Sequence, residues 1–443
     1  MKRGVLYACQ KCGMQSPKWL GRCPDCGAWE SFVEEVLESH QKSEVSSAPA
    51  QTLRLEEASH TDVERIPSGM EGMNRLLGGG WVPGSVVLIG GEPGVGKSTL
   101  MLQLASQFSS RGSVFYISGE ESPAQVAMRA RRLGVQKGIT LVAETALEPL
   151  TALLEKESPA LVVVDSIQTI LTGDLSSAPG SVSQVRAVTS VLSRMAKAQS
   201  FILVIVGHVT KEGAIAGPRT LEHMVDVVLY FEGDLEYQYR MLRSHKNRYG
   251  STFELVVFEM TEGGLKEQDN PSRLFLAHRD KPPVGTAITA VLTGTQPLLL
   301  EVQALTVPTP YPTPRRTTVG LDINRLHLLT AVMIRHGLNL GNLDIYANVA
   351  GGFPIRETGA DLALVAAVAS SLHNRTLPEN CLFVGEVGLT GEIRPVPRLD
   401  IRLKEAKQQG FTTAYTPAVD LKAPRGLTLK SVDHINAILK LLR

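Results

Sequence analysis

Short apolar runs separated by polar stretches of helical periodicity dominate the chain from about residue 55 to residue 265. Apolar runs without polar alternation are typical of strands that are buried on both faces of a parallel sheet. The runs lie at Val86–Gly90, Val114–Ser118, Leu161–Asp165, Phe201–Gly207 and Val227–Phe231. The pattern therefore predicts an α/β fold with a mainly parallel sheet covered by helices.

Different patterns flank this region. Residues 39–51 are rich in Ser, Ala, Glu and Gln without a sustained apolar period, which predicts a linker. Near the other end, Ala287–Leu292 and Leu298–Ala304 predict strands, and Val307–Pro314 predicts a Pro-rich loop before mixed helices and strands. We therefore predict a cysteine-rich module (1–38), a linker (39–54), an α/β domain (55–269) and a C-terminal α+β domain (270–443).

The segment after the first apolar run carries the strongest functional signal. It has the phosphate-binding P-loop pattern and precedes an apolar helical stretch, and it consists of Gly91, Glu92, Pro93, Gly94, Val95, Gly96, Lys97 and Ser98. In such a loop, backbone N–H groups surround the β-phosphate, the lysine reaches the β- and γ-phosphates, and the serine hydroxyl binds magnesium. The segment predicts ATP and Mg²⁺ as ligands, and an ordinary glycine-rich turn is the alternative.

Carboxylates follow two other predicted strands. Asp165 ends one apolar run and is placed to reach the magnesium ion, as in a Walker B element. Glu120 and Glu121 follow another strand at the same edge of the sheet, where a carboxylate can polarise the attacking water. Two exposed turn carboxylates are the alternative. His208, at the end of a further strand, is either a nucleotide sensor or a structural histidine.

Four of the five cysteines lie within the first 26 residues, as the pairs Cys9 with Cys12 and Cys23 with Cys26. Two Cys-x2-Cys pairs can close a tetrahedral site of four thiolates, which predicts Zn²⁺, or iron in a zinc-like site. Because protein ligands fill all four positions, the site would be structural. Two disulfides are the alternative. Cys381 lies in an apolar setting, where we expect it to pack as a small hydrophobic residue.

Composition limits the partners. The 443 residues, 43% of them apolar, are enough for two or three domains with real cores. Lys and Arg total 45 against 44 Asp and Glu, so any polyanion site must be a local concentration of charge. We find no apolar run that could span a bilayer and no signal-peptide core, so we expect a cytoplasmic protein without a membrane partner.

The order of these signatures, followed by Lys246-Asn247-Arg248-Tyr249-Gly250, resembles the RecA and DnaB-helicase class of ATPases. With the four-cysteine module and the C-terminal region, the whole chain is similar to the RadA (Sms) family of bacterial DNA repair proteins. The resemblance implies that Glu120 activates water, with Glu121 as second choice. It also implies that Lys246 and Arg248 meet the γ-phosphate of a neighbouring subunit, and that Tyr249 replaces the usual Phe of that motif. A solvated basic strand end is the alternative for these two cations.

The resemblance further implies a homo-oligomeric, hexameric ring that acts as a DNA-dependent ATPase and motor. Such a ring would bind single-stranded and branched DNA, promote branch migration in recombinational repair and work with a recombinase such as RecA. The segments 172–181 and 208–219 correspond to channel-lining loops, the latter with Lys211 and Arg219 for phosphate contact. Mobile surface loops are the alternative. An ATP-dependent peptidase and a regulatory ATPase scaffold like KaiC are the rival functions.

Residues 342–410 resemble the proteolytic domain of Lon protease, notably at 351–354, 358–361 and 384–396. Lon uses a Ser nucleophile activated by Lys. The resemblance places Gly359 at the nucleophile position and Asp400 at the lysine position, and neither side chain can perform that chemistry. We therefore expect an inactive peptidase fold retained for assembly or DNA contact. The nearby Ser370, Ser371 and Lys404 miss the required positions.

Overall fold

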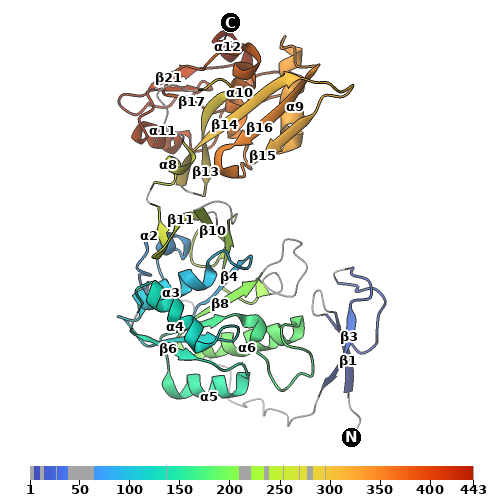
Figure 1. Cartoon of the computed structure of the whole chain (residues 1–443), viewed down its shortest axis with the longest axis vertical. Helices are drawn as coiled ribbons and strands as arrows, with labels where there is room; N and C mark the ends of the chain where they lie inside the picture. Colours follow the sequence, from blue (N-terminus) through green and yellow to red (C-terminus); the bar gives the residue numbers. More distant parts are fainter. Residues whose placement is uncertain are drawn as a thin grey trace, which may run out of the picture. The chain divides into compact units, whose positions relative to one another are not determined.

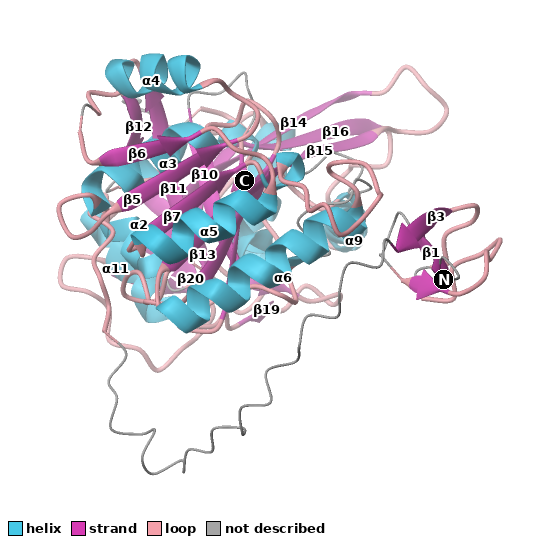
Figure 2. Ribbon diagram, turned by 90° about the horizontal axis from the view of Figure 1, so that it is seen from below, coloured by secondary structure: helices cyan, strands magenta, loops and turns pink. Residues whose placement is uncertain are grey.

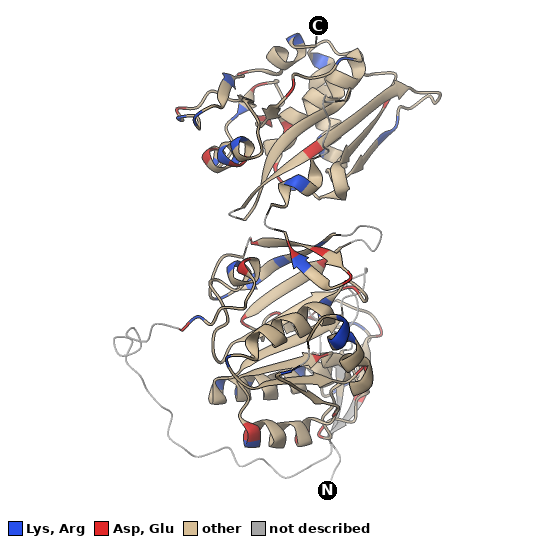
Figure 3. Cartoon of the chain, turned by 60° about the vertical axis from the view of Figure 1, so that its left-hand side comes forward, with Lys and Arg blue, Asp and Glu red and all other residues tan. Residues whose placement is uncertain are grey.

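The computed structural model describes residues 4–9, 14–25, 27–37, 64–135, 137–208, 221–233, 239–252, 254–268, 270–276, 283–294 and 296–442. The chain divides into two compact units, Met1–Gln268 and Asp269–Arg443 (Figure 1). Each unit contains a large β-sheet with its own buried core. Lys and Arg are interspersed with Asp and Glu along both units (Figure 3).

The N-terminal segment of the first unit forms a small antiparallel sheet in the order β2-β1-β3. Its strands are β1 (Gly4–Cys9), β2 (Gln15–Ser16) and β3 (Phe32–Leu37). Cys9, Cys23 and Phe32 are buried together at its centre. A core this small needs additional cross-links to be stable, and metal binding commonly supplies them.

The large sheet of the first unit has nine strands among the described residues, in the order β12-β11-β10-β9-β4-β8-β7-β5-β6. The strands are β4 (Val86–Gly91), β5 (Val114–Ser118), β6 (Ile139–Val142), β7 (Leu161–Asp165), β8 (Ile202–His208), β9 (Val227–Glu232), β10 (Tyr239–Asn247), β11 (Leu255–Thr261) and β12 (Gly264–Glu267). The block from β9 to β6 is parallel, and β10, β11 and β12 are antiparallel. The predicted mainly parallel sheet and its five strands are confirmed.

Helices cover both faces of this sheet. Alternate strand residues point to opposite faces, and because nearly all of them are apolar, both faces have to be buried. The helices are α2 (Glu71–Leu76), α3 (Lys97–Phe108), α4 (Pro123–Arg132), α5 (Leu147–Glu157) and α6 (Val182–Gln199). Ile89 of β4 packs in the cluster that contains Leu100 of α3, whereas Leu88 packs with Val185 of α6. Figure 2 shows α5 and α6 side by side across the strands.

The second unit is built on a seven-stranded sheet of the described residues, in the order β15-β16-β14-β13-β17-β20-β21. The strands are β13 (Thr286–Thr293), β14 (Gln296–Pro308), β15 (Arg316–Val319), β16 (Leu343–Val349), β17 (Cys381–Phe383), β20 (Thr413–Thr416) and β21 (Thr428–Ser431). The two predicted strands correspond to β13 and β14. The predicted Pro-rich loop began too early, because β14 pairs with β16 as far as Pro308.

The remaining elements of the second unit are helices, 3-10 turns and two short strands. They are α8 (Ser272–Phe275), α9 (Ile323–Arg335), the 3-10 turns η2 (Ala350–Gly352) and η3 (Thr358–Ala360), α10 (Asp361–His373), β18 (Glu386–Val387), β19 (Ile393–Arg394), α11 (Leu399–Gln408) and α12 (Ile435–Lys440). Every residue of α10 from Asp361 to Ser370 is buried, so this helix forms the centre of the core. No helix in the described ranges has the length and apolar character that crossing a membrane would require.

Candidate nucleotide site and neighbouring sites

The phosphate-binding loop connects β4 to α3 at the carboxyl edge of the parallel strands. Gly94 and Gly96 have φ of +79° and +115°, a region that residues with a Cβ rarely adopt. A Cβ at position 96 would also lie 3.1 Å from Cε of Met260. The turn therefore requires glycine at position 96, and the helix that follows begins at Lys97 with its N-terminus facing the loop.

Lys97 is only 4% exposed and folds back over its own loop. Its Nζ donates to the carbonyl oxygens of Gly91 at 2.8 Å and Glu92 at 2.9 Å, and it lies 3.2 Å from Nδ1 of His208. Burial lowers the pKa of Lys97 to about 8, although the charges of Asp165 and Glu120 act in the opposite direction. The contacts of this amine with Gly91 and Glu92 are to carbonyl dipoles, and a phosphate at this position would give it a negatively charged partner.

A hydrogen-bonded chain leads from Lys97 across the carboxyl edge of the sheet. His208 ends β8, and its Nε2 lies 3.2 Å from a carboxylate oxygen of Glu120. The same carboxylate accepts a hydrogen bond from the hydroxyl of Ser166 at 2.5 Å. Ser166 is completely buried, whereas the Glu120 side chain is 44% exposed. The carboxylate of Glu120 is thus fixed on one side and open to solvent on the other.

The neighbouring Glu121 has different surroundings. Both of its carboxylate oxygens accept from Arg129 of α4, at 2.7 and 2.5 Å, in a bidentate ion pair. The hydroxyl of Ser118 donates to its backbone carbonyl at 2.8 Å. The structure therefore separates the two glutamates: Glu120 joins the chain to Lys97, and Glu121 is occupied by Arg129.

Asp165 ends β7 and is followed by a cis peptide bond to Ser166. The hydroxyl of Tyr116, on the adjacent β5, donates to Oδ2 of Asp165 at 2.5 Å. Tyr116 is 1% exposed, and burial, followed by the charge of Asp165, raises the pKa of the phenol well above its usual value. The phenol thus remains a hydrogen-bond donor to the carboxylate.

The residues at this edge fit a nucleotide with a magnesium ion. Ser98 lies in the first turn of α3 and Asp165 ends β7, and β8 is the only strand between β4 and β7 in the described sheet. Hydroxyl and carboxylate oxygens are hard ligands of the kind that Mg²⁺ prefers. Ser98 and Asp165 would hold the ion, which would supply positive charge to neutralise the phosphates.

Lys246 and Arg248 lie near the amino-terminal ends of the parallel strands, whereas the phosphate-binding loop of the same chain lies at their carboxyl ends. Lys246 pairs with Val228 near the start of β9, whereas Gly91 pairs with Phe231 near its end. At about 3.3 Å per residue, roughly 10 Å of strand separates the two positions before side chains are considered. The two cations are therefore remote from the Lys97 amine of the same chain.

Both cations are held by nearby groups. Lys246 Nζ donates to the carbonyl oxygens of Glu222 at 2.6 Å and Val225 at 2.9 Å. Burial and the neighbouring Arg248 lower the pKa of Lys246. Arg248 donates to Asp226 at 2.8 Å, and this carboxylate is 3% exposed. The Arg248 side chain itself is 54% exposed, so its guanidinium is accessible from outside the subunit.

The first candidate channel loop, residues 172–181, is well organised. The amide of Gln184, which is 1% exposed, donates to the carbonyl oxygens of Thr172, Leu175 and Ser177 at 3.0 to 3.2 Å. The carboxylate of Glu148 accepts from the Thr172 hydroxyl at 2.6 Å and the Gly173 N–H at 3.0 Å. The second loop, with Lys211 and Arg219, lies outside the described residues.

The N-terminal sheet brings one cysteine of each pair into a common core. Cys9 and Cys23 are both 0% exposed and belong to the same cluster. The Cys9 N–H donates to Met14 O at 2.9 Å, and the Cys23 N–H donates to Ala28 O at 2.8 Å. Each pair therefore starts a turn of the same length, which suits a thiolate site. Cys12 and Cys26 lie outside the described residues.

In the second unit, an ion pair between a buried arginine and a partly exposed glutamate occupies the surroundings of Gly359. Arg402 is 1% exposed and forms a bidentate pair with Glu357, with Nη2 at 2.8 Å from Oε2. A Cβ on Gly359 would lie 3.3 Å from the Glu357 carboxylate and 3.4 Å from the Arg402 guanidinium. Asp400 lies in the first turn of α11.

Two nearby serines are engaged in hydrogen bonds with the backbone. The Ser370 hydroxyl is completely buried, donates to Arg375 O at 2.5 Å and accepts from the Gly285 N–H at 2.9 Å. The Ser371 hydroxyl accepts from the Thr306 N–H at 2.9 Å. These contacts assign both hydroxyls to joining α10 to the sheet.

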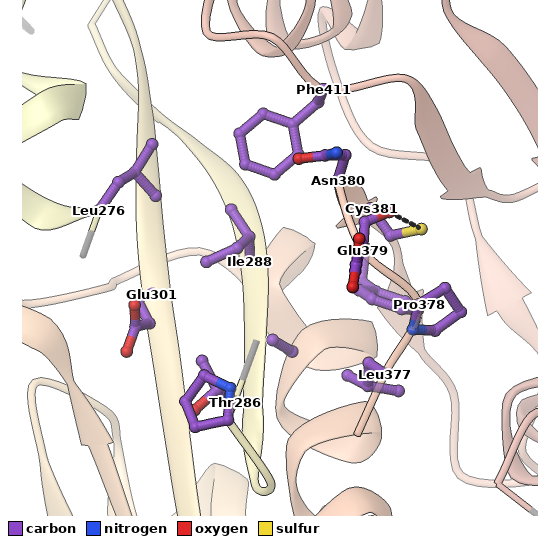
Figure 4. Close-up of a pocket in the computed structure, with 13 residues that line it drawn as sticks. Leu276, Thr286, Ile288, Glu301, Leu377, Pro378, Glu379, Asn380, Cys381 and Phe411 are labelled. Carbon is purple, nitrogen blue, oxygen red and sulfur yellow. Dashed lines mark hydrogen bonds between the residues drawn. The ribbon is translucent and has the colours of Figure 1, made fainter. Parts of the chain in front are cut away.

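A hollow of about 140 Å³ elsewhere in this unit contains Cys381 among largely apolar walls (Figure 4). The thiol donates to the carbonyl oxygen of Glu379 at 3.3 Å. Burial is the main cause that raises the pKa of the thiol above its usual value. Cys381 is 6% exposed and packs as a small hydrophobic residue, as its apolar sequence context indicated.

Comparisons with known proteins agree with this geometry. Residues 50–214 match the family described as AAA domain, and residues 7–34 match the rubredoxin metal binding domain. The DNA repair protein RadA of Streptococcus pyogenes serotype M6 is 46% identical over 447 residues, with 99% of each chain covered. The chain belongs to the RadA family.

Two further RadA proteins show the same relationship. The DNA repair protein RadA of Pseudomonas aeruginosa is 47% identical, with 99% of this chain and 98% of the relative covered. The RadA of Bacillus subtilis strain 168 is also 47% identical, with 98% and 97% covered. The predicted resemblance to the RadA family is confirmed over nearly the full length.

Sequence reasoning missed several residues of this RadA-family site. Ser166 directly follows Asp165, and Tyr116 precedes Ser118 by two positions on the same strand face, so adjacency to known motifs could have indicated both. The pairing of Arg129 with Glu121 depends on the turn between β5 and α4, and the sequence alone gives no signal for it. The sequence does not decide between two roles for His208, and the structure places it between Lys97 and Glu120.

Proposed function

We propose that this RadA-family chain is a magnesium-dependent ATP hydrolase that couples hydrolysis to movement on DNA during recombinational repair. The observation that carries the proposal is the hydrogen-bonded chain from Lys97 through His208 to Glu120 and Ser166, directly beside a P-loop. It joins a phosphate ligand to a carboxylate that is open to solvent. An ATP hydrolase needs both groups within one site.

In this proposal Glu120 orients the attacking water and accepts its proton, because its carboxylate is fixed by Ser166 and exposed on its other side. Lys97 and the backbone N–H groups of the loop stabilise the charge on the phosphates. His208 lies between them, so it can report phosphate occupancy to Glu120. Ser98 and Asp165 would hold Mg²⁺.

We also propose that Lys246 and Arg248 act on the γ-phosphate of a neighbouring subunit. They lie at the opposite edge of the sheet from their own loop, and Arg248 is half exposed. Each site would then be completed only by assembly, as in a closed ring such as a hexamer. A fixed guanidinium can form two hydrogen bonds to phosphate oxygens, and this geometry favours Arg for such a role.

DNA is the proposed effector, as the names of the relatives as DNA repair proteins suggest. We propose single-stranded and branched DNA as ligands, branch migration as the outcome and a recombinase such as RecA as partner. Residues 172–181 would contribute an ordered channel loop, positioned by Gln184 and Glu148. Lys211 and Arg219 of the following loop would supply the phosphate contacts.

The two flanking parts have supporting roles in this proposal. Four thiolates, from Cys9, Cys12, Cys23 and Cys26, would bind Zn²⁺ and stabilise the N-terminal sheet for contact with DNA or protein. The second unit would serve assembly or DNA contact without cutting peptides. The Glu357–Arg402 pair beside Gly359 and the backbone contacts of Ser370 support this view.

The test is ATP hydrolysis by the full chain with and without a single-stranded oligonucleotide, over a range of salt concentrations. We expect DNA to stimulate turnover and salt to weaken DNA binding steeply, because phosphate contacts release counterions. Hydrolysis that is indifferent to DNA would contradict the motor. In that case a regulatory ATPase scaffold would fit better, and casein cleavage by the pure chain would favour the peptidase.

A further inference from the structure

A buried tyrosine hydroxyl reaches the nucleotide site from inside the sheet. The Tyr116 ring belongs to the apolar cluster that packs beneath α3, and only its oxygen has a polar partner. Tyr116 pairs with Val163 across β5 and β7, and Ser118 pairs with Asp165. The side chain therefore reaches along the neighbouring strand to meet the Asp165 carboxylate.

This contact restricts the orientation of the carboxylate. An ionised carboxylate only accepts hydrogen bonds, and it has two equivalent oxygens. Among the described residues, the hydrogen bond to the Asp165 carboxylate comes from Tyr116 and engages Oδ2. A donor fixed by a packed ring therefore determines the rotation of the carboxylate and leaves Oδ1 available to another ligand.

We propose that Tyr116 is a positioning residue for metal binding, which orients the Asp165 carboxylate toward the divalent cation that accompanies the nucleotide. The inference rests on the proposed function, because Asp165 is a metal ligand only if the first unit binds a magnesium nucleotide. Groups that hydrogen-bond to metal ligands typically change metal affinity about 10- to 100-fold when they are removed.

The competing interpretation is that Tyr116 only fills space in the core. Phe fills nearly the same volume and would leave the cluster around Leu100 and Val163 intact. A space-filling role therefore predicts that Tyr116→Phe has no effect on the metal dependence. A positioning role predicts a selective loss of metal affinity.

The experiment titrates Mg²⁺ against the full chain with a fluorescent, slowly hydrolysed ATP analogue, and measures ATP turnover in parallel. For Tyr116→Phe we expect the half-saturating Mg²⁺ concentration to rise about tenfold or more. Turnover at saturating Mg²⁺ should recover, and nucleotide affinity in EDTA should be unchanged. The matched control is Tyr230→Phe, which removes another hydroxyl of the same sheet that donates to a carboxylate, Glu222, at 2.7 Å.

An unchanged Mg²⁺ midpoint in Tyr116→Phe would overturn the inference, as would an equal shift in Tyr230→Phe. A second measurement keeps the hydroxyl in place. Tyr116 is replaced by 3-fluorotyrosine in a chain that remains active, and its resonance is observed by ¹⁹F NMR. Its resonance should shift when Mg²⁺ is added to the nucleotide complex, and a fixed resonance would also overturn the inference. If the wild-type chain shows no Mg²⁺-dependent nucleotide binding, the proposed function itself fails.

Discussion

Two adjacent glutamates show how local partners decide the chemistry of a side chain. Glu120 faces Ser166 and His208 with nearly half of its surface open to solvent, whereas the oxygens of Glu121 are both taken by Arg129. A carboxylate whose two oxygens both accept from a guanidinium is poorly placed to accept a hydrogen bond from a water molecule as well. The sequence favoured Glu120 only by resemblance, and these contacts supply a physical reason.

We predict that Glu120→Gln lowers kcat for ATP hydrolysis by about 10²- to 10⁴-fold, because the proposed general base is lost. Nucleotide binding should persist, since Lys97 and the loop remain. Glu121→Gln is the matched control and should lower kcat much less, because it only loosens the contact with Arg129. Steady-state turnover and equilibrium nucleotide binding measure both effects, and a larger loss in Glu121→Gln would reverse the assignment.

The buried amine of Lys97 leads to a pH prediction. Its pKa in the free protein is about 8, lowered by burial, and a bound triphosphate should raise it by supplying negative charge. Above about pH 8 nucleotide binding must therefore take up protons, and affinity should fall as the pH rises further. Near pH 7 the amine is already mostly charged, so uptake by Lys97 should be small.

Calorimetry in buffers of different ionisation enthalpy measures this proton uptake directly. At about pH 9 the apparent binding heat should depend on the buffer, with a positive number of protons absorbed. Near pH 7 the same comparison provides the internal control. A binding heat at about pH 9 that is identical in all buffers would show that Lys97 does not change its protonation on binding.

At the level of elements, the sequence predicted what short-range patterns determine. Unbroken apolar runs located five parallel strands, and the glycine spacing located the phosphate loop. The antiparallel strands β10 and β12 lack such runs, whereas β11 begins with the apolar run 255–258; none of the three was predicted as a sheet strand. Contacts such as Tyr116 with Asp165 depend on which strands are adjacent, and strand order is a long-range property.

The loop of residues 172–181 shows how one buried side chain can organise an irregular segment. Gln184 contacts three loop carbonyls and also accepts from the Thr172 N–H at 2.9 Å. A buried amide that satisfies several backbone groups is costly to replace, because each abandoned polar group then lacks a partner. The conformation of this loop therefore depends on a residue of the helix that follows it.

We predict that Gln184→Leu destabilises the first unit by about 2 kcal/mol or more, since it leaves buried carbonyl groups without partners. Amide hydrogen exchange should accelerate at Thr172, whose N–H loses its acceptor. Gln199→Leu, at an exposed position of the same helix, should change stability by no more than about 0.5 kcal/mol. Urea unfolding and hydrogen-exchange mass spectrometry compare the two variants. Equal effects would show that the contacts of Gln184 with the loop contribute no special stability.

At the level of the whole molecule, the two halves of the proposed catalytic site lie at opposite ends of the parallel strands of one sheet. Lys97 and Glu120 follow the carboxyl ends of parallel strands, and Lys246 and Arg248 lie beside the start of β9. A head-to-tail arrangement of copies would bring one edge against the other, and such interfaces close into rings when the rotation permits. A single subunit would then lack the two cations that complete its catalytic site.

Mixing two inactive variants tests this proposal. Lys97→Ala and Arg248→Ala should each abolish most turnover when assayed separately, because one lacks the phosphate ligand and the other the cation for its neighbour. After co-assembly at equal amounts, an Arg248→Ala subunit keeps Lys97 and can receive Arg248 from a Lys97→Ala neighbour. Random mixing should make about a quarter of the sites complete, so activity should return to a comparable fraction.

The control separates assembly from simple dilution. A mixture of Lys97→Ala with Glu120→Gln should stay inactive, because both residues belong to the same half of the site and no neighbour can supply either one. Turnover restored only in the first mixture requires Arg248 to act across a subunit boundary. If neither mixture recovers while both variants assemble normally, Arg248 serves its own subunit, where its partner Asp226 would confine it to a structural role.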